Sequence, residues 1–141
     1  MIDKIITNHS KLKTISKETT IEEVESLDLI NRLRASNGTA WTKGAGLAAI
    51  QIGIALRFAW FIWGEKEFTL LNPCIIEFGG KRKLVREGCL SIPNKYFKVK
   101  RRYKIKYTSD GKRLSARGFK AELIQHEIDH MNGVLISDKK E

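Results

Sequence analysis

The segment Gln125-His126-Glu127-Ile128-Asp129-His130 constrains the fold of this chain more than any other. Its two histidines are four residues apart, so on a helix both imidazoles lie on one face and reach the same ion. A divalent metal held by two imidazoles lowers the pKa of a bound water, and the Glu127 carboxylate beside it can accept that water's proton. The segment therefore predicts a helix with a metal site suited to hydrolysis.

The pattern around this segment predicts a helix that begins near Gly118 and stops at Asn132-Gly133. On a helical projection, Leu123, His126 and His130 share one face, and mainly apolar residues continue the arc. Such a helix is expected to be mostly buried. Buried imidazoles are costly unless they are paired or bind a metal, so burial favours the metal site over two plain core histidines.

With 141 residues, the chain is predicted to form a single catalytic domain, with an N-terminal arm over residues 1–19 and a short polar tail over 137–141. No apolar run is long enough to span a bilayer, and the N-terminus has no pattern of a secretion signal. We therefore expect a cytoplasmic protein that does not enter a membrane.

The two cysteines are expected to be reduced in that compartment and to differ in role. Cys74 has apolar neighbours, so we expect a buried, inert thiol. Cys89 follows Gly88 and precedes Pro93, an arrangement that interrupts a strand pattern. Cys89 is therefore the better candidate for a third metal ligand.

The charge of the chain is strongly positive, with 26 Lys and Arg against 16 Asp and Glu, a formal net charge of +10. A positive field attracts polyanions such as RNA. Seven of these cations lie in the basic segment, residues 95–106, where they alternate with aromatic residues. Alternation also fits a solvated strand with Tyr103, Ile105 and Tyr107 facing inward, and we favour that interpretation.

The remaining pattern predicts one further helix and three β-hairpins. The helix begins at Thr20, capped with Glu23, and ends at Asn37-Gly38. A short strand is expected over residues 134–136. The predicted hairpins pair residues 57–63 with 67–71, residues 74–78 with 82–86 across Gly79-Gly80, and residues 103–108 with 113–116 across Asp110-Gly111.

Residues 44–53, Gly-Ala-Gly-Leu-Ala-Ala-Ile-Gln-Ile-Gly, are too rich in small side chains for an ordinary helix or strand. The buried amide of Gln51 needs hydrogen-bond partners. It is therefore either a core amide satisfied by backbone or a donor directed into a site, and the residues alone leave both open.

Three separated motifs together resemble the signature of the peptide deformylases. They are Gly44-Ala45-Gly46-Leu47-Ala48-Ala49-Ile50-Gln51, Glu87-Gly88-Cys89-Leu90-Ser91 and Gln125-His126-Glu127-Ile128-Asp129-His130. The resemblance covers about residues 20–136. It implies an α+β fold with antiparallel β-sheets packed around a central metal-binding helix, and removal of the formyl group from the N-terminal formyl-methionine of newly made peptides.

The resemblance also implies a role for each matching residue. Cys89, His126 and His130 would bind one divalent metal, and Glu127 would act as general base and then acid while the metal-bound water attacks the formyl carbon. The Gln51 amide and the Leu90 backbone N–H would stabilise the oxyanion. The residues expected at the substrate are Ala45, Gly46, Gly88, Val85, Arg101, Phe119 and Leu123. Glu87 would support a ligand or a neighbouring loop.

Fe(II) is the native metal that the resemblance suggests, although Zn, Ni or Co also fit two imidazoles and a thiolate. Many bacterial members continue into a further helix that meets the ribosome, whereas this chain has five residues after Ile136. It thus resembles the short forms, some of which phages encode, and a phage protein would act in the host-cell cytoplasm. The basic segment is the candidate surface for a weak ribosome contact.

Two alternatives remain at this stage. Another His-Glu-x-x-His hydrolase, such as a small peptidase, shares the helix motif, but usually takes Glu or His where Cys89 stands. A basic RNA-binding module with a structural metal would need four protein ligands, and three are evident.

Overall fold

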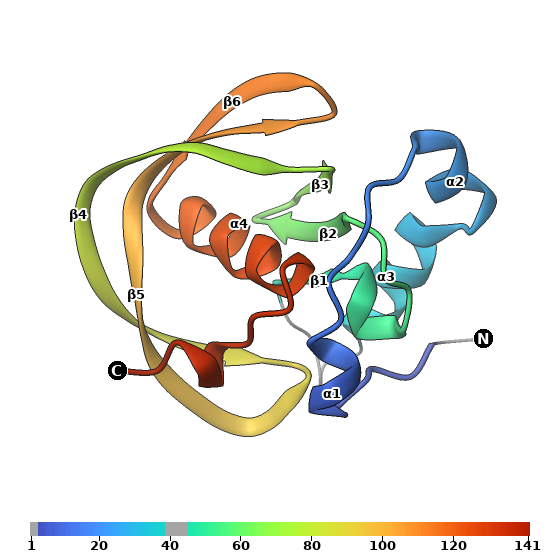
Figure 1. The fold of residues 1–141 in the computed structure, drawn as a ribbon, viewed down its shortest axis with the longest axis horizontal. Helices are drawn as coiled ribbons and strands as arrows, with labels where there is room; N and C mark the ends of the chain where they lie inside the picture. Colours follow the sequence, from blue (N-terminus) through green and yellow to red (C-terminus); the bar gives the residue numbers. More distant parts are fainter. Residues whose placement is uncertain (1–2, 39–44) are drawn as a thin grey trace.

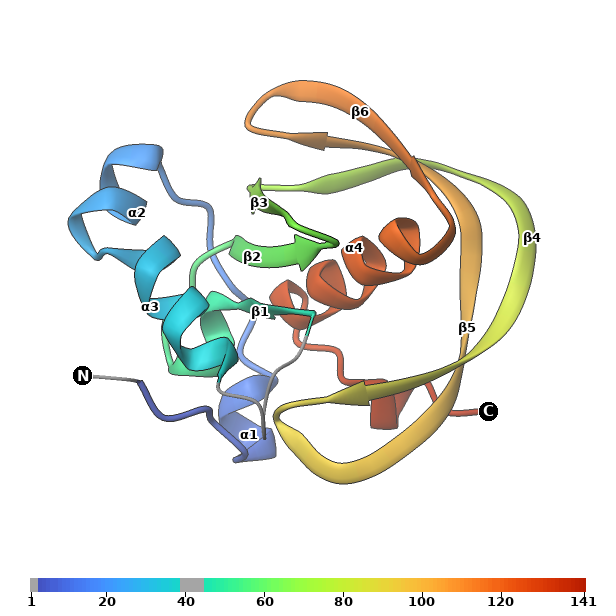
Figure 2. The same ribbon diagram turned by 180° about the vertical axis from the view of Figure 1, so that it is seen from behind.

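The computed structural model describes residues 3–38 and 45–141, and its organising element is helix α4 (Gly118–Met131). In Figures 1 and 2, α4 lies at the centre, with one sheet curving around it and the remaining elements on its other side. The elements, in chain order, are α1 (His9–Leu12), α2 (Ile21–Ser26), α3 (Leu29–Asn37), β1 (Gly46–Ala48), the 3₁₀ helix η1 (Ala49–Ile52), β2 (Phe58–Trp63), β3 (Lys66–Leu71), β4 (Cys74–Cys89), β5 (Ile92–Ser109), β6 (Lys112–Arg117), α4, and the 3₁₀ helix η2 (Ile136–Asp138).

The strands form two antiparallel three-stranded sheets, β1-β2-β3 and β4-β5-β6. In the larger sheet, β4 and β5 are long and curve around α4 (Figure 1). The α+β fold expected from the sequence, with antiparallel sheets around a metal-binding helix, is therefore confirmed. The hairpins β2–β3 and β5–β6 and the bounds of α4 also agree with the prediction.

The predicted second hairpin is wrong. Gly79-Gly80 does not turn the chain, because β4 continues through it to Cys89 and pairs with β5 along almost its whole length. The register shifts between Gly79 and Arg82, and Gly80 has a φ of +69°. The two glycines therefore form a β-bulge, which bends the strand around α4 instead of ending it.

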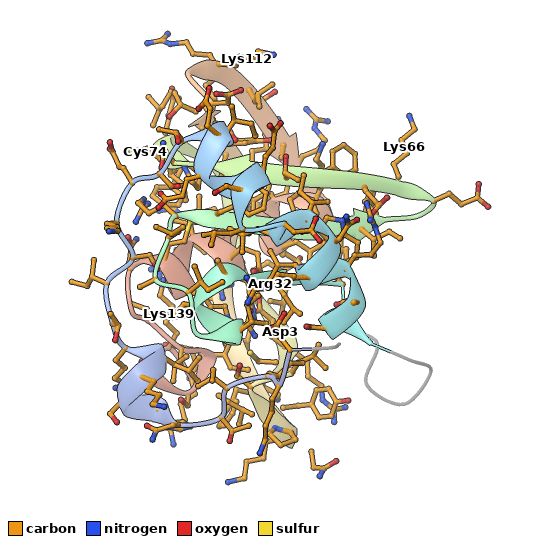
Figure 3. All side chains as sticks on the ribbon, turned by 90° about the vertical axis from the view of Figure 1, so that its right-hand side faces the viewer. Asp3, Arg32, Lys66, Cys74, Lys112 and Lys139 are labelled. Atoms are coloured by element: carbon orange, nitrogen blue, oxygen red, sulfur yellow. The ribbon has the colours of Figure 1, made fainter. Side chains whose placement is uncertain are left out.

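Other sequence expectations need smaller corrections. The predicted single helix after Thr20 is two helices, because Asp28 has a left-handed φ of 52° and breaks it, although the Thr20 cap is present. Residues 134–136 form no strand, and the chain enters η2 there. Cys74 is exposed at the start of β4 and not buried (Figure 3).

The two ends of the chain are tied to the domain. In the N-terminal arm, Leu12 is fully buried, whereas Ile15 is 73% exposed. The Asp3 carboxylate pairs with Arg32 of α3 at 2.9 Å (Figure 3). At the other end, the Glu141 N–H donates to the Lys98 carbonyl at 2.9 Å, so the expected polar tail lies along β5.

The core consists of three apolar clusters. The first lies between α4 and the sheets and includes Ile105, Ile124 and Met131. The second joins α2 and α3 to the small sheet, and the third joins α1 to β5 and the C-terminal segment. Within β5, Ile105 and Tyr107 face inward as expected, whereas Tyr103 is 43% exposed. Among the described residues, no helix is long and apolar enough to cross a membrane.

Candidate metal centre and active site

Cys89, His126 and His130 meet where the end of β4 crosses α4. One ligand atom from each lies within 4.8 Å of the others, and Cys89 Sγ is 3.4 Å from His130 Nε2. The helix supplies both imidazoles because four residues advance slightly more than one turn. The strand supplies the thiol because β4 ends there. The three ligands predicted from the sequence are thus brought together.

The chemistry of these groups fits a divalent cation. Burial alone would raise the pKa of the Cys89 thiol, but the neighbouring His130 and His126 outweigh it and hold that pKa well below its usual value. A thiolate is the form that binds metal. His130 is 1% exposed and its Nδ1 has no hydrogen-bond partner among the described residues, which is costly unless the ring has another partner.

His126 is oriented by Glu87. Its Nδ1 lies 3.0 Å from Glu87 Oε1, and a carboxylate there makes Nδ1 the protonated nitrogen and leaves Nε2 free as an acceptor. Burial would raise the pKa of Glu87, but hydrogen bonds from Arg101 and His126 lower it to about 2. Glu87 is therefore ionised, and the ligand support expected from the sequence is present.

Arg101 has a different place from the one expected. It was predicted to lie near the peptide, but it is 2% exposed and does not line the cleft. Its guanidinium forms two hydrogen bonds to Glu87, at 2.7 and 2.8 Å, and one to Asp129 at 2.6 Å. Arg101 therefore joins the end of β4 to α4 and fixes the carboxylate that orients His126.

Glu127 lies at the floor of the cleft and is 2% exposed. Its Oε2 has no hydrogen-bond partner among the described residues. Burial raises the pKa of Glu127, despite the opposing effect of His126 and His130. A carboxylate with a raised pKa can both accept and return a proton near neutral pH.

Gln51 resolves the alternative that the sequence left open. Its Oε1 accepts the Ala48 backbone N–H at 3.0 Å, and its Nε2 donates to Ser91 Oγ at 3.1 Å and points to Cys89 Sγ at 3.6 Å. The amide is thus held by backbone and also directed into the site. Ser91 is 1% exposed and belongs to the second motif, but a small hydroxyl residue gives no distinct sequence signal that it contacts Gln51.

A cleft of about 900 Å³ opens above these groups. Of the expected substrate residues, Ala45, Gly46, Gly88, Phe119 and Leu123 line it, as do Leu90 and Glu127. Val85 does not; it lies on β4 opposite Val99 and is half-buried. Gly44, the first residue of the small-residue motif, lies outside the described residues.

Gly46 and Gly88, two of the residues expected at the substrate, line the cleft and also serve packing. A Cβ on Gly46 would lie 2.4 Å from Phe61 Cβ, so its absence lets β1 approach β2. A Cβ on Gly88 would lie 2.9 Å from the Tyr96 ring. The Cβ on Gly46 would point at β2, and the Cβ on Gly88 would point at a ring that itself lines the cleft.

The comparisons with known proteins agree with this geometry. The family model described as polypeptide deformylase matches residues 2–141. The chain belongs to the polypeptide deformylase family. A peptide deformylase of Dictyoglomus turgidum is 37% identical over 136 residues, covering 92% of this chain and 84% of that protein.

Two solved structures of deformylases resemble the fold closely. The crystal structure of peptide deformylase from Thermotoga maritima superposes with a TM-score of 0.89 at 30% identity, covering 100% of this chain and 99% of that one. The PDF of the Vibrio parahaemolyticus bacteriophage VP16T, in complex with actinonin, gives a TM-score of 0.82 at 32% identity, covering 94% and 98%.

Family membership confirms three expectations from the sequence: the resemblance, the enzyme class, and deformylation of N-terminal formyl-methionine as the reaction. The family and the Cys-His-His cluster together support a single divalent metal. Family membership does not favour either alternative, a peptidase or an RNA-binding module, as the main activity.

Proposed function

We propose that this chain deformylates nascent peptides with Glu127 as the proton carrier and with Cys89, His126 and His130 as metal ligands. The observation that carries the proposal is the convergence of the three ligands beside a buried carboxylate whose Oε2 has no hydrogen-bond partner among the described residues. We also propose that residues 1–141 form a single catalytic domain.

Cys89, His126 and His130 would hold a divalent cation, which would supply Lewis-acid chemistry by polarising a carbonyl and acidifying water. Glu127 accepts a proton from the attacking water at its carboxylate. It then gives that proton to the departing amine nitrogen as the formyl C–N bond breaks, and the products are formate and the free amino terminus.

Gln51 and Leu90 provide the hydrogen bonds to the developing oxyanion. The Gln51 amide is held in orientation by the Ala48 N–H and by Ser91, so the N–H that points toward Cys89 Sγ in this structure costs little to reorganise during the reaction. The Leu90 backbone N–H is the second donor. Removing one such donor costs roughly 10²–10³ in rate in comparable sites.

The peptide is expected to lie along β1 as an added strand. β1 pairs only with β2 among the described residues, so its other edge is available near Ala45 and Gly46, with Gly88 across the cleft. The methionine side chain is placed against Phe119 and Leu123, which line the cleft from the first turns of α4. Main-chain contacts would then allow many sequences after the methionine.

We propose that the enzyme acts in the cytoplasm, where formylated chains are made. We also propose Fe(II) as the native metal. A ferrous site with a thiolate ligand is vulnerable to oxidation. We expect the iron-loaded enzyme to lose activity in air faster than nickel- or cobalt-loaded enzyme. Equal decay of all three forms would contradict the assignment of iron.

The reaction itself is tested with formyl-Met-Ala-Ser and its acetyl counterpart. We expect formate release from the first, no acetate release from the second, and inhibition by actinonin, which the VP16T protein binds. Cleavage of the Met-Ala peptide bond in either substrate would instead support the peptidase alternative.

A further inference from the structure

The positive charge of the chain is concentrated in one sheet. Residues 74–117, which comprise β4, β5 and β6, contain fourteen Lys and Arg but three Asp and Glu, a formal net charge of +11. The remaining residues together carry −1, since the whole chain carries +10. Of the three acids, Glu87 is already paired with Arg101.

Like charges are set directly opposite one another across the strands of this sheet. Such pairs destabilise a sheet, so scattered surface charge chosen only for solubility would not be expected to collect there. The register contains four such pairs: Arg86 with Lys98, Arg82 with Arg102, Lys104 with Arg117, and Lys83 with Arg101. The six side chains of the first three pairs are exposed or half-buried, whereas Arg101 is buried against Glu87.

A surface depression lined by some of these cations lies at the bulge in β4. A shallow depression of about 440 Å³ is lined by Lys81, Arg82, Lys83 and Tyr103. The Gly79-Gly80 bulge brings three consecutive cations around a tyrosine that is 43% exposed. This depression shares no lining residue with the catalytic cleft. It is therefore separate from the active site.

Cations around an exposed aromatic ring suit single-stranded nucleic acid. The cations neutralise phosphates, and the ring offers a face on which an unpaired base stacks, without regard to sequence. Figures 1 and 2 show β4 and β5 curving around α4, so one side of this sheet faces away from the helix. Arg82 belongs both to a like-charged pair and to the depression, so the two features adjoin.

We propose that the β4-β5-β6 sheet is an RNA-binding face, with the depression around Tyr103 receiving an unpaired nucleotide. RNA is favoured over other polyanions because formylated nascent chains emerge from a machine built largely of RNA; this choice of partner rests on the proposed function. The contact would hold the enzyme near its substrates.

The test measures anisotropy of a labelled single-stranded RNA with the full-length, metal-loaded protein. The face variant is Lys81→Glu with Lys83→Glu. The control variant, Lys11→Glu with Lys66→Glu, has the same net charge, and both of its lysines are exposed on elements outside the β4-β5-β6 sheet. Lys66 projects from the small sheet in Figure 3.

The face variant should bind RNA more weakly, and its slope of log K against log salt should fall by about 1.4, because each phosphate contact to a single strand contributes about 0.7. The control should keep the wild-type slope. Equal weakening in both variants would overturn the proposal, because net charge alone would then explain binding.

Tyr103 separates stacking from charge. Tyr103→Ala should weaken RNA binding about tenfold, whereas Tyr103→Phe, which keeps the ring, should bind as wild type.

All variants should release formate from formyl-Met-Ala-Ser at the wild-type rate, because none changes a residue that lines the cleft. RNA binding is thus measured independently of catalysis.

Vesicles of phosphatidylglycerol and phosphatidylcholine test the other large anionic surface. Binding to these vesicles with no binding to RNA would overturn the choice of RNA. A protein that binds RNA through Tyr103 but releases no formate would contradict the proposed function and leave the binding face intact.

Discussion

At the scale of single residues, the orientation of the proposed ligand His126 depends on charged side chains around it. The Glu87 carboxylate orients His126. The Arg101 guanidinium binds both Glu87 and Asp129, and so holds Glu87 in place. All three charged groups are largely buried. The imidazole is therefore fixed before any cation binds, which reduces the cost of assembling the site.

Glu87→Gln should weaken metal binding by about 10- to 100-fold, because the neutral amide is a poorer acceptor for the His126 Nδ1–H and no longer balances Arg101. Competition with a metallochromic chelator measures this affinity. Asp129→Asn is the matched control: it makes the same chemical change beside Arg101 but does not contact His126. Equal losses in the two variants would show that the charge on Arg101, and not the orientation of His126, controls affinity.

The single-residue roles differ in how visible they are in a sequence. The proposed ligands and Glu127 could be singled out in the sequence because their spacing and residue types are distinctive, and the structure brings the three ligand side chains together. Arg101 could not be assigned correctly, since it is one cation within a basic segment and only the fold shows that its side chain turns inward. Cys74 was misjudged for a similar reason: apolar neighbours in sequence do not reveal an exposed position at a strand end.

At the scale of elements, α4 is held against the curved sheet by polar contacts as well as by its apolar face. The Gln125 side chain accepts the Arg102 N–H at 3.1 Å and donates to the Arg102 carbonyl at 2.9 Å. A side-chain amide therefore pairs with the backbone of β5 as a neighbouring strand would. This contact helps to set how far the helix lies from the sheet, and hence where its histidines lie.

Gln125→Met should lower the free energy of unfolding by about 1–3 kcal/mol, because the Arg102 N–H and carbonyl lose their partners while the apolar volume is nearly kept. Urea denaturation measures the change. Glu122→Met, on the same helix with no hydrogen bond to β5 given by the structure, is expected to change stability by less than about 0.5 kcal/mol. If the Gln125 variant were as stable as wild type, the amide contact would not be what holds the helix to β5.

The approach of β1 to β2 depends on Gly46. Gly46→Ala should destabilise the protein by about 1–3 kcal/mol, because the new Cβ would overlap Phe61 and push the strands apart. Gly79→Ala adds the same methyl where the nearest atom is 3.5 Å away, so it should be close to neutral. Thermal unfolding compares the two, and a neutral Gly46→Ala would show that β1 can move away from β2 at little cost.

Element boundaries were predictable where the signal is local. Asp110-Gly111 turns the β5–β6 hairpin with two positive φ angles, as its sequence indicates. Gly79-Gly80 carries the same local signal, yet β4 continues, because β5 offers it pairing partners far away in the chain. Asp28 breaks a helix whose apolar spacing continues without interruption, and that spacing gives no warning of a left-handed residue.

At the scale of the whole molecule, the metal centre lies at a junction that other contacts also hold. β4 and α4 meet through the ligands, through the Arg101 ion pairs and through the first apolar cluster. The fold is therefore not expected to depend on the cation, unlike a small module whose metal is its main core.

Removing the metal with a chelator should abolish formate release and leave the far-UV circular dichroism spectrum nearly unchanged. The loss of a bound ligand lowers the unfolding temperature without unfolding the protein at room temperature. Re-addition of the metal should restore turnover. Complete unfolding on chelation would instead indicate a structural metal.

The central claim is that Glu127 carries the proton in a deformylase reaction, and formate release by Glu127→Gln tests it most directly. The variant should bind the metal with wild-type stoichiometry, because Glu127 is not one of the three ligands, and should lose roughly 10²–10⁴ in kcat. Wild-type turnover of formyl-Met-Ala-Ser by a metal-filled Glu127→Gln enzyme would contradict the account.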